Sequence, residues 1–247
     1  MDRALYIAMT GATQTLRAQA ANSHNLANAS TVGFRAQLLN AAAAPVNGAG
    51  LPTRVASTAA DEGWDARGGA IQQTGRDLDI ALRDDAWLAV QALDGSEAYT
   101  KAGDLQLDAN GQLRTAAGLP VLSDGGLVSL PPHGGLQIGG DGTVSIVPLG
   151  QGAETLSTVA RLKIVSARPD QLTRGADGLM RGKPADAPPP ASGNVLSAGM
   201  LESSNVNLPE TMVNMISLAR QFELQVKLMK TAESNAQASS SLLRIGG

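Results

Sequence analysis

Residues 24–37 read HNLANASTVGFRAQ, and a helical pattern ends within them. Upstream of this stretch, apolar and small residues recur at alternating steps of four and three, which is the spacing of one helix face. The positions are Leu5, Met9, Ala12, Leu16, Gln19, Ser23 and Leu26. Gly33 follows the periodic residues and can adopt the left-handed conformation of a helix C-cap. The pattern predicts a helix that starts near the N-terminus and stops before Phe34.

Asparagines recur at every third position along the end of this predicted helix. They are Asn22, Asn25 and Asn28, and asparagine is a poor helix former because its amide competes for backbone hydrogen bonds. An amide at a packed seam must find a partner, so one interpretation is that the row fixes the register of neighbouring helices. The same spacing suits a solvated polar edge near a fraying helix end. Spacing alone leaves both interpretations open.

A second helix is predicted near the C-terminus, from residue 208 to about residue 240. Asn207 can cap this helix, Pro209 lies in its first turn, and Glu210 can reach back as in a capping box. The apolar positions again alternate in steps of three and four, at Met212, Met215, Ala219, Phe222, Val226 and Met229. A helix of this length spans roughly 45–50 Å at about 1.5 Å per residue.

Between the helices the hydrophobic period changes to two, which predicts strands. The predicted strands are residues 77–82, 87–92, 104–108, 126–130, 135–138, 143–147 and 160–165. Asn110-Gly111 and Gly140-Asp141-Gly142 suit tight hairpin turns, so this part of the chain is predicted to be mostly antiparallel. Residues 184–193, PADAPPPASG, are predicted to be a proline-rich loop or hinge.

Together these features predict an α+β fold in three parts. Residues 1–34 and 205–247 are expected to form a helical domain, in which the two long helices pair as a coiled-coil-like layer, parallel or antiparallel. Residues 35–75 show few periodic apolar positions and are expected to form an extended connector. Residues 76–204 are expected to form the β-rich domain.

Composition excludes several classes of protein. The chain has 247 residues, a formal net charge of −3 and no cysteine. It has no basic run of the kind that binds nucleic acid. Polar residues interrupt the opening stretch from Thr10 to Arg17, so it does not read as a cleaved secretory signal. No apolar run approaches the roughly 20 residues of a membrane-spanning helix. We therefore expect no nucleic-acid partner and no direct membrane insertion.

No motif with catalytic or ligand-binding chemistry is complete. Residues 178–184, GLMRGKP, lack the first glycine and the Ser or Thr of a phosphate-binding loop. Residues 108–111, DANG, lack the flanking carboxylates of a calcium loop and suit a hairpin instead. His24 and His133 have no cysteine partners for a structural zinc ion. We expect no catalytic, cofactor or metal site, no small-molecule substrate and no enzymatic activity.

A pair of such helices would leave apolar surface uncovered. The C-terminal helix is marginal alone, because ordering its backbone costs roughly 1–2 kcal/mol per residue and packing must offset that cost. Further apolar side chains lie off the main seam, at Leu5, Ile7, Ile216, Leu218, Leu224 and Leu228. Either the helical layer is buried within its own domain, or it packs against copies of itself, because exposed apolar faces mark partner sites.

Both ends of the chain resemble signatures of the bacterial flagellar rod and hook proteins. The first follows the form NNLAN-x-x-T-x-GF-[KR], with His24 in place of the first asparagine. Its matching residues are Asn25, Leu26, Ala27, Asn28, Thr31, Gly33, Phe34 and Arg35. The second, GMLESSNVNLPETMVNMISLARQFELQ, resembles the closing signature of the same family. It is carried by Leu201, Glu202, Ser204, Asn205, Val206, Asn207, Met212, Ile216, Arg220 and Phe222.

The middle of the chain is similar to the β domain of that family, with two departures. Residues 84–88, DDAWL, stand in place of the usual GxGxF run, and residues 100–103, TKAG, in place of TRxG. The resemblance covers nearly the whole chain in order. Within the family, the opening residues and the run STVGFRAQL are closer to the proximal rod subunit than to the distal rod subunit.

The resemblance implies a structural subunit of the flagellar drive shaft. Such a subunit assembles helically with copies of itself and with other rod subunits, and it transmits motor torque. It implies export through the flagellar type III apparatus without a cleaved signal peptide, a place in the periplasmic rod of the basal body, and no cofactor. The residues expected to form the assembly interface are Leu5, Met9, Leu16, Asn22, Asn25, Leu26, Asn28, Gly33, Phe34, Met212, Met215, Ile216, Ala219, Phe222, Val226 and Met229.

Three alternatives remain at the level of sequence. The chain can be the distal rod subunit of the same family. It can be a β binding domain raised on a helical stalk, which would form a closed oligomer of fixed stoichiometry. It can be a hydrolase that uses loop carboxylates, of which Asp61, Glu62, Asp84 and Asp85 are the candidates.

Overall fold

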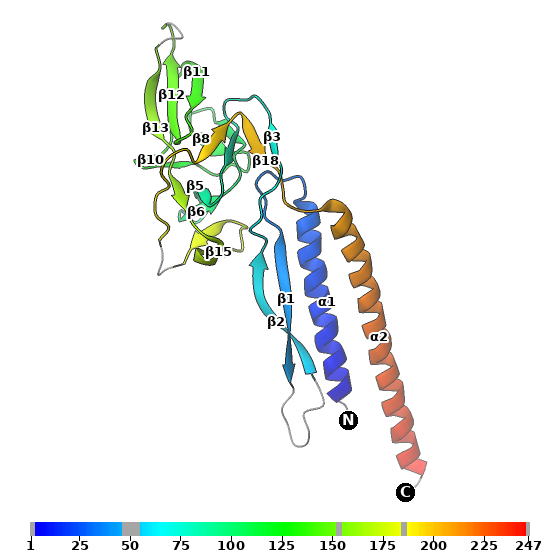
Figure 1. Cartoon of the computed structure of the whole chain (residues 1–247). Helices are drawn as coiled ribbons and strands as arrows, with labels where there is room; N and C mark the ends of the chain where they lie inside the picture. Colours follow the sequence, from blue (N-terminus) through cyan, green and yellow to red (C-terminus); the bar gives the residue numbers. More distant parts are fainter. Residues whose placement is uncertain (1–2, 46–54, 152–154, 184–186, 246–247) are drawn as a thin grey trace. The chain divides into compact units, whose positions relative to one another are not determined.

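The computed structural model describes residues 3–45, 55–151, 155–183 and 187–245 of the chain (Figure 1). The chain divides into two compact units. The helical unit comprises Met1–Ala29, Ala36–Asp65 and Val206–Gly247, and the β-rich unit comprises Ser30–Arg35 and Ala66–Asn205. The fold is α+β, as the sequence predicts, with the long helices at the two ends of the chain and antiparallel strands between them.

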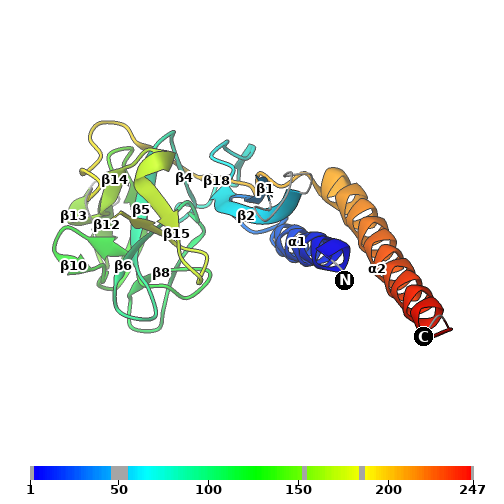
Figure 2. The same cartoon turned by 90° about the horizontal axis from the view of Figure 1, so that it is seen from below.

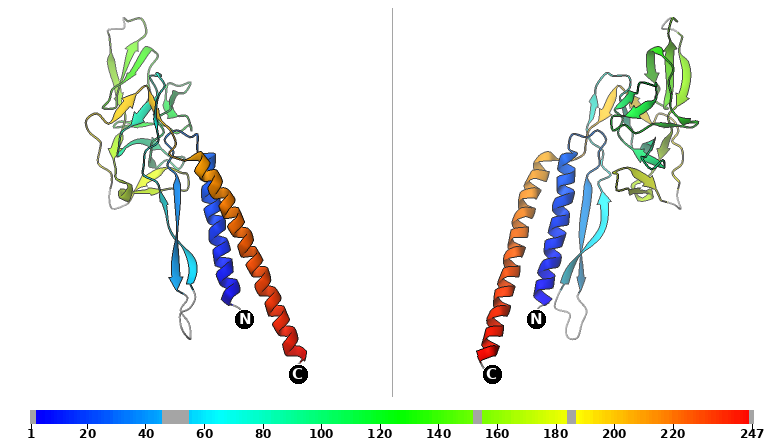
Figure 3. Two further views of the ribbon diagram at one scale, coloured as in Figure 1. Left: turned by 45° about the vertical axis from the view of Figure 1, so that its right-hand side comes forward. Right: turned by 180° about the vertical axis from the view of Figure 1, so that it is seen from behind.

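The helical unit contains two long helices that run antiparallel (Figure 3). They are α1, Arg3–Ala27, and α2, Leu208–Ile245. Thr15 of α1 contacts Gln225 of α2, and Asn22 contacts Thr211, so residue numbers rise along one helix as they fall along the other. This arrangement decides between the two directions that the sequence leaves open. With 38 residues against 25, α2 is about 20 Å longer than α1 at roughly 1.5 Å per residue.

A β-hairpin packs on the other side of α1 (Figures 1 and 2). It consists of β1, Gln37–Pro45, and β2, Val55–Trp64, in antiparallel register. These residues therefore form paired strands and not the extended connector that the sequence indicates. The sequence misses them because their alanine-rich stretches show no alternation of apolar and polar residues. Residues 46–54 of the predicted connector lie outside the described residues.

The β-rich unit is built from short strands, and every strand pairing in the described residues is antiparallel. The strands are β3 Ile71–Gln73, β4 Ile80–Leu82, β5 Ala86–Gln91, β6 Glu97–Thr100, β7 Leu105–Leu107, β8 Leu113–Thr115, β9 Leu122–Ser123, β10 Gly126–Leu127, β11 His133–Ile138, β12 Thr143–Pro148, β13 Ser157–Arg161, β14 Ile164–Ser166, β15 Leu172–Arg174, β16 Met180–Gly182, β17 Leu196–Ala198 and β18 Met200–Glu202.

The largest sheet of this unit has the order β14-β5-β6-β16-β15, and a second sheet has the order β11-β12-β13. Each predicted strand corresponds to at least part of an observed one, although residues 160–165 are divided between β13 and β14. Gly111 and Gly142 have φ of +76° and +86°, which confirms the predicted tight turns. The short strands β15 to β18 carry too few residues for a periodic pattern, and the sequence does not reveal them.

The core of the β-rich unit is aliphatic. Its most deeply buried side chains are Ile80, Leu88, Val90, Leu105, Leu113, Val121, Val128, Val144, Val165 and Leu196. Trp87 is also buried, and its Nε1 donates a hydrogen bond to the carbonyl oxygen of Ala167 at 3.1 Å. The proline-rich loop contributes an edge, because Pro189 and Ala191 form backbone hydrogen bonds with β14. Residues 184–186 of that loop lie outside the described residues.

Candidate assembly site

Three large apolar side chains of α1 face away from its partners within the chain, whereas Ile7 and Leu26 are partly buried. Leu5, Met9 and Leu16 are 37%, 47% and 49% exposed. The buried positions of α1 carry small side chains instead, namely Ala12, Thr15 and Ala21. At about 100° per residue, the predicted stripe lies roughly a quarter turn from the face that contacts α2. The sequence therefore predicts the helix but not which of its faces packs inside the chain.

The contact of α1 with α2 is close and partly polar. Thr15 Oγ1 donates to Gln225 Oε1 at 3.2 Å. A Cβ atom placed on Gly11 would lie 3.1 Å from Gln225 Nε2, so a glycine leaves just enough room at this point. Small residues allow two helices to pack closely, and the Thr15–Gln225 hydrogen bond fixes the axial register of α1 against α2.

The predicted residues of α2 divide into two groups. Met215, Ala219, Phe222, Val226 and Met229 are half-buried and lie on the same face as Gln225. Met212 and Ile216 are 48% and 57% exposed. Three further apolar side chains of α2 are more exposed still, at Val213, Leu224 and Leu228. The first group packs within the helical unit, and the others remain available on its surface.

The asparagine row finds its partners within the same chain. Asn22 Nδ2 donates to the carbonyl oxygen of Thr211 at 2.8 Å. Asn25 forms two bonds with the backbone of Gln37: its Nδ2 donates to the carbonyl oxygen at 2.9 Å and its Oδ1 accepts from the N–H at 2.7 Å. Asn28 Nδ2 donates to the carbonyl oxygen of His24. Asn22 thus bonds the neighbouring helix, as the register interpretation expects, whereas Asn25 bonds the start of β1 and Asn28 bonds its own helix.

Gly33 is not the C-cap of the first helix, which corrects the sequence prediction. The helix ends at Ala27. Gly33 has φ of +66°, and its N–H donates to the carbonyl oxygen of Glu202 at 2.8 Å. A Cβ atom at this position would lie 2.3 Å from the backbone of Lys101, so the site requires glycine for space as well as for conformation. Gly33 does adopt the predicted left-handed conformation, but it does so in a turn of the β-rich unit and not at the end of a helix.

Phe34 and Arg35 are held in the β-rich unit as well. The guanidinium of Arg174 lies 4.9 Å from the centre of the Phe34 ring, and its Nη1 donates to the carbonyl oxygen of Arg35 at 3.1 Å. Arg35 Nη2 lies 2.8 Å from Glu202 Oε1, with side-chain exposures of 4% and 6%. The same carboxylate oxygen accepts the N–H of Gly69 at 2.8 Å. Motifs at the two ends of the sequence therefore meet in one buried ion pair.

Lys101 is a second buried cation near this pair, with 2% of its surface exposed. Its Nζ donates to the carbonyl oxygen of Asp84 at 2.5 Å and lies 5.0 Å from the centre of the Trp87 ring. Burial, followed by repulsion from Arg35, lowers the pKa of Lys101 to about 8, against the partial attraction of Glu202, Asp85 and Asp84. The charged lysine is thus held at a cost in free energy.

We expect the β-rich unit to become more stable as the pH rises from 7 to 9.5. Because the folded-state pKa of Lys101 lies near 8 and its ordinary value is 10.5, the unfolded chain binds more protons between these values. The free energy of unfolding should rise by about 2 kcal/mol over this range. Tyr99 does not oppose this rise within the window, because burial raises the pKa of its phenol from 10.0 to about 12 and the resulting stabilisation is lost only as the pH rises above 10. Urea unfolding at several pH values tests this, and Lys101→Met should flatten the profile.

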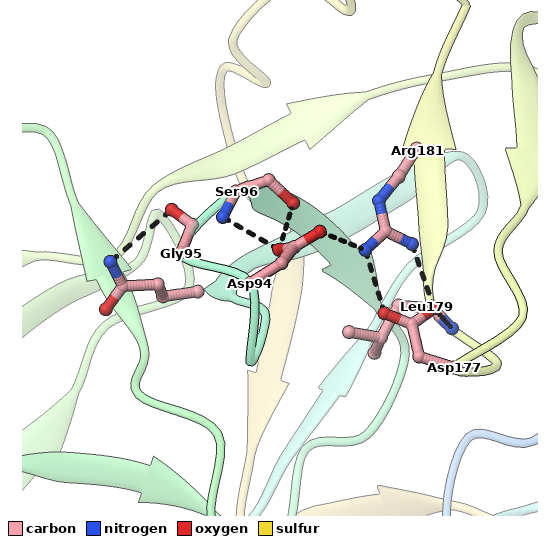
Figure 4. Close-up of polar contacts among 7 residues, drawn as sticks. Asp94, Gly95, Ser96, Asp177, Leu179 and Arg181 are labelled. Carbon is pink, nitrogen blue, oxygen red and sulfur yellow. Dashed lines mark hydrogen bonds and ion pairs between the residues drawn. The ribbon is translucent and has the colours of Figure 1, made fainter.

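A network of charged groups joins two turns on the surface of the β-rich unit (Figure 4). Arg181 donates from both Nη atoms to the carboxylate of Asp177 at 2.8 Å, and its Nη2 also lies 3.5 Å from Asp94. Hydrogen bonds from Ser96 lower the pKa of Asp94, and Arg181 lowers the pKa of Asp177. The network ties the turn between β5 and β6 to the hairpin of β15 and β16.

One cavity of the β-rich unit is lined by two of the four carboxylates of the hydrolase alternative, Asp84 and Asp85. It has a volume of about 410 Å³ and is lined by Asp84, Asp85, Ser166, Ser192 and Asn194, among others. Within the described residues, no group of three or more His, Cys, Asp or Glu side chains could hold a metal ion. No helix in the described part of the chain has the length and apolar character that crossing a membrane requires.

Three family models match the chain in order. "Flagella basal body rod protein" matches residues 5–35, "Flagellar hook protein FlgE/F/G D1 domain" matches residues 81–146, and "Flagellar basal body rod FlgEFG protein C-terminal" matches residues 197–242. The first match ends at Arg35 and the last includes Glu202, so the buried ion pair joins them. These matches define a protein of the flagellar rod and hook class.

Comparison with individual relatives narrows the identification from this class to one family within it. The flagellar basal-body rod protein FlgF of Escherichia coli (strain K12) is 45% identical over 252 residues, covering 98% of this chain and 99% of that one. FlgF of Salmonella typhimurium is 43% identical over 251 residues, with the same coverage. The rod protein FlgG of Bacillus subtilis (strain 168) is 34% identical over 185 residues, covering 71% and 69%. The chain belongs to the FlgF family of flagellar basal-body rod proteins.

Proposed function

We propose that this chain is a structural subunit of the proximal rod of the flagellar basal body, and that its copies assemble helically to transmit motor torque. Membership of the FlgF family supports the rod assignment. The observation that supports assembly between copies is the exposure of large apolar side chains on both long helices. The proposal includes no catalytic step, no cofactor, and export through the flagellar type III apparatus without a cleaved signal.

The outer faces of the helices are suited to contacts between copies. The outer stripe of α1, which we define as Leu5, Met9 and Leu16, and the outer stripe of α2, defined as Val213, Leu224 and Leu228, are exposed by 37% to 65%. Full burial of such a side chain gains roughly 1.5–3 kcal/mol relative to full exposure, so these half-covered ones gain on the order of 1 kcal/mol each. Such gains become large when many copies repeat the contact.

The two stripes also differ, which is what an open assembly needs. A helical filament requires heterologous contacts, in which one surface meets a different surface of the next copy. The stripe of α1 contains methionine and leucine beside few charges, whereas the stripe of α2 runs past Arg220, Glu223 and Lys227. When the face of α1 on one copy meets the face of α2 on the next in a heterologous contact, each end of the row keeps one face free, and the row stays open if the rotation between copies does not close into a ring.

Deletion of the gene that encodes this chain tests the proposal. Basal bodies from the deletion strain, imaged by electron cryo-microscopy, should lack a continuous rod, and the cells should not swim. Expression of the chain from a plasmid should restore both. A gold label on the chain should lie in the half of the rod nearer the cytoplasmic membrane, and a label in the other half would favour the distal rod. Swimming cells with intact rods would refute the assignment.

A further inference from the structure

A short segment of the chain belongs to a different unit from the residues on both of its sides. Ser30–Arg35 is part of the β-rich unit, whereas Ala29 and Ala36 belong to the helical unit. We call Ser30–Arg35 the latch segment. The chain thus leaves the helical unit at the end of α1, contributes these residues to the β-rich unit, and returns at once to form β1.

Glu202 binds the latch segment through both its backbone and its side chain. Its carbonyl oxygen accepts the N–H of Gly33, and its Oε1 accepts from Arg35 Nη2, both at 2.8 Å. The same Oε1 accepts the N–H of Gly69, which lies on the segment that leads from β2 to β3. One residue therefore joins three separate stretches of the chain, and its carboxylate is nearly inaccessible to water.

Neighbouring groups repeat these connections. The N–H of Asn205 donates to the carbonyl oxygen of Phe34 at 3.3 Å, and Asn205 Nδ2 donates to the carbonyl oxygen of Arg67 at 2.8 Å. Ser203 and Ala70 form two hydrogen bonds with each other. The N–H of Ser203 donates to the carbonyl oxygen of Ala70 at 2.9 Å, and the N–H of Ala70 donates to Ser203 Oγ at 3.0 Å. The stretches around residues 33, 69 and 203 are the places where the chain passes between the units.

The base of the same loop is closed inside the helical unit. Asn25, near the end of α1, forms its pair of hydrogen bonds with Gln37, the first residue of β1. Residues 28–36 thus connect α1 to β1 as a loop, whose base is fixed by Asn25 and Gln37 and whose tip is fixed by Glu202. The motif NLANASTVGFRAQ supplies the chain's residues at both of these places, Asn25 and Gln37 at the base and Gly33 and Arg35 at the tip.

We propose that the latch segment is a conformational coupling device, in which insertion of Gly33, Phe34 and Arg35 under Glu202 in the β-rich unit holds the end of α1 and the start of β1 in their folded geometry. When the latch segment is released, the loop lengthens and the pair of bonds between Asn25 and Gln37 loses its constraint. Order in this part of the helical unit then depends on the β-rich unit having folded.

The chemistry of the latch favours such a role. Within the described residues, Nε and Nη1 of Arg35 are buried without a hydrogen-bond partner, so Glu202 supplies the one ion pair of this guanidinium. A buried ion pair adds little net stability, because desolvation offsets the attraction. Losing one partner is costly, however, so the segment has few alternative positions. An ion pair of this kind selects one arrangement and responds sharply when that arrangement is broken.

Residue-resolved hydrogen exchange on the purified full-length chain tests the coupling. The amides of Gly33 and Gly69 report on the latch, the amide of Gln37 reports on the base of the loop, and the amide of Leu113, bonded to Val128, reports on the β-rich core. In Glu202→Gln, exchange at all three reporters of the loop should rise at least tenfold, while Leu113 should exchange within about twofold of the wild-type rate.

A matched control and a milder variant complete the test. Glu97→Gln makes the same chemical change in an exposed pair, where Glu97 lies 2.7 Å from Lys163, and it should leave all four amides unchanged. Phe34→Leu keeps the ion pair but loses the contact with Arg174, so it should raise exchange at the same three amides by less. If Glu202→Gln does not fold, Phe34→Leu alone tests the coupling. Faster exchange at Gly33 and Gly69 with an unchanged Gln37, in either folded variant, would overturn the coupling, as would a uniform rise that includes Leu113.

Discussion

Glu202→Ala is expected to lower the free energy of unfolding of the β-rich unit by about 3–5 kcal/mol, the usual cost of removing one partner from a buried ion pair. The substitution leaves the Arg35 guanidinium, 4% exposed, without its carboxylate. It also leaves the N–H of Gly69 without an acceptor. The effect is large because the ion pair is buried and water cannot replace the lost carboxylate beside Arg35.

Urea unfolding followed by tryptophan fluorescence measures this loss. The chain has two tryptophans, so Trp64→Phe leaves Trp87 of the β-rich core as the single reporter. The double variant Arg35→Met/Glu202→Met removes both charges and should recover a substantial part of the lost stability. A loss below about 1 kcal/mol in Glu202→Ala would mean that the pair behaves as an exposed one does, contrary to its burial.

Leu16→Asp is expected to abolish swimming while leaving the purified chain folded. Leu16 is already 49% exposed in the single molecule, so a carboxylate at this position can remain hydrated there. In an assembled rod the same carboxylate would have to enter an apolar contact repeated in every copy, which costs several kcal/mol per copy. The measurement is the swim-plate diameter of a deletion strain that expresses the variant, together with the urea midpoint of the isolated protein.

Arg17 is exposed and lies about 100° around α1 from Leu16, away from the outer stripe of α1. Arg17→Asp therefore provides a control on the same helix. It should support near-wild-type swimming. Equal swimming of the two variants would remove the outer stripe of α1 from the assembly contacts. Phe222→Asp asks a different question, because Phe222 is half-buried on the seam face of α2 and its loss should unfold the helical unit itself.

Sequence patterns predict the elements of this protein better than their contacts. The two helices and the main strands of the β-rich core have enough residues for their periods to be visible, and they are confirmed. The hairpin of β1 and β2 is missed because alanine suits either face of a strand and carries no alternation. The face of α1 is misjudged for a related reason, because its seam is built from alanine, threonine and glycine.

The buried ion pair shows a different limit. Arg35 and Glu202 both stand in the recognised motifs, yet no local pattern states that they touch, because they lie at opposite ends of the chain. The sequence predicts a left-handed conformation for Gly33, and this residue does have positive φ. The sequence does not predict what Gly33 contacts, because the glycine lies against Lys101 and Glu202, far along the chain, and does not end a helix.

The discontinuous make-up of the β-rich unit has a practical consequence for anyone who wishes to produce it alone. An excised polypeptide of residues 66–205 would lack Ser30–Arg35 and so present an acidic vacancy where the arginine belongs. We expect fragment complementation: a synthetic peptide carrying STVGFR, added in trans, should restore solubility and thermal resistance to the excised polypeptide. The order in which the two pieces regain structure would reveal which of them templates the other.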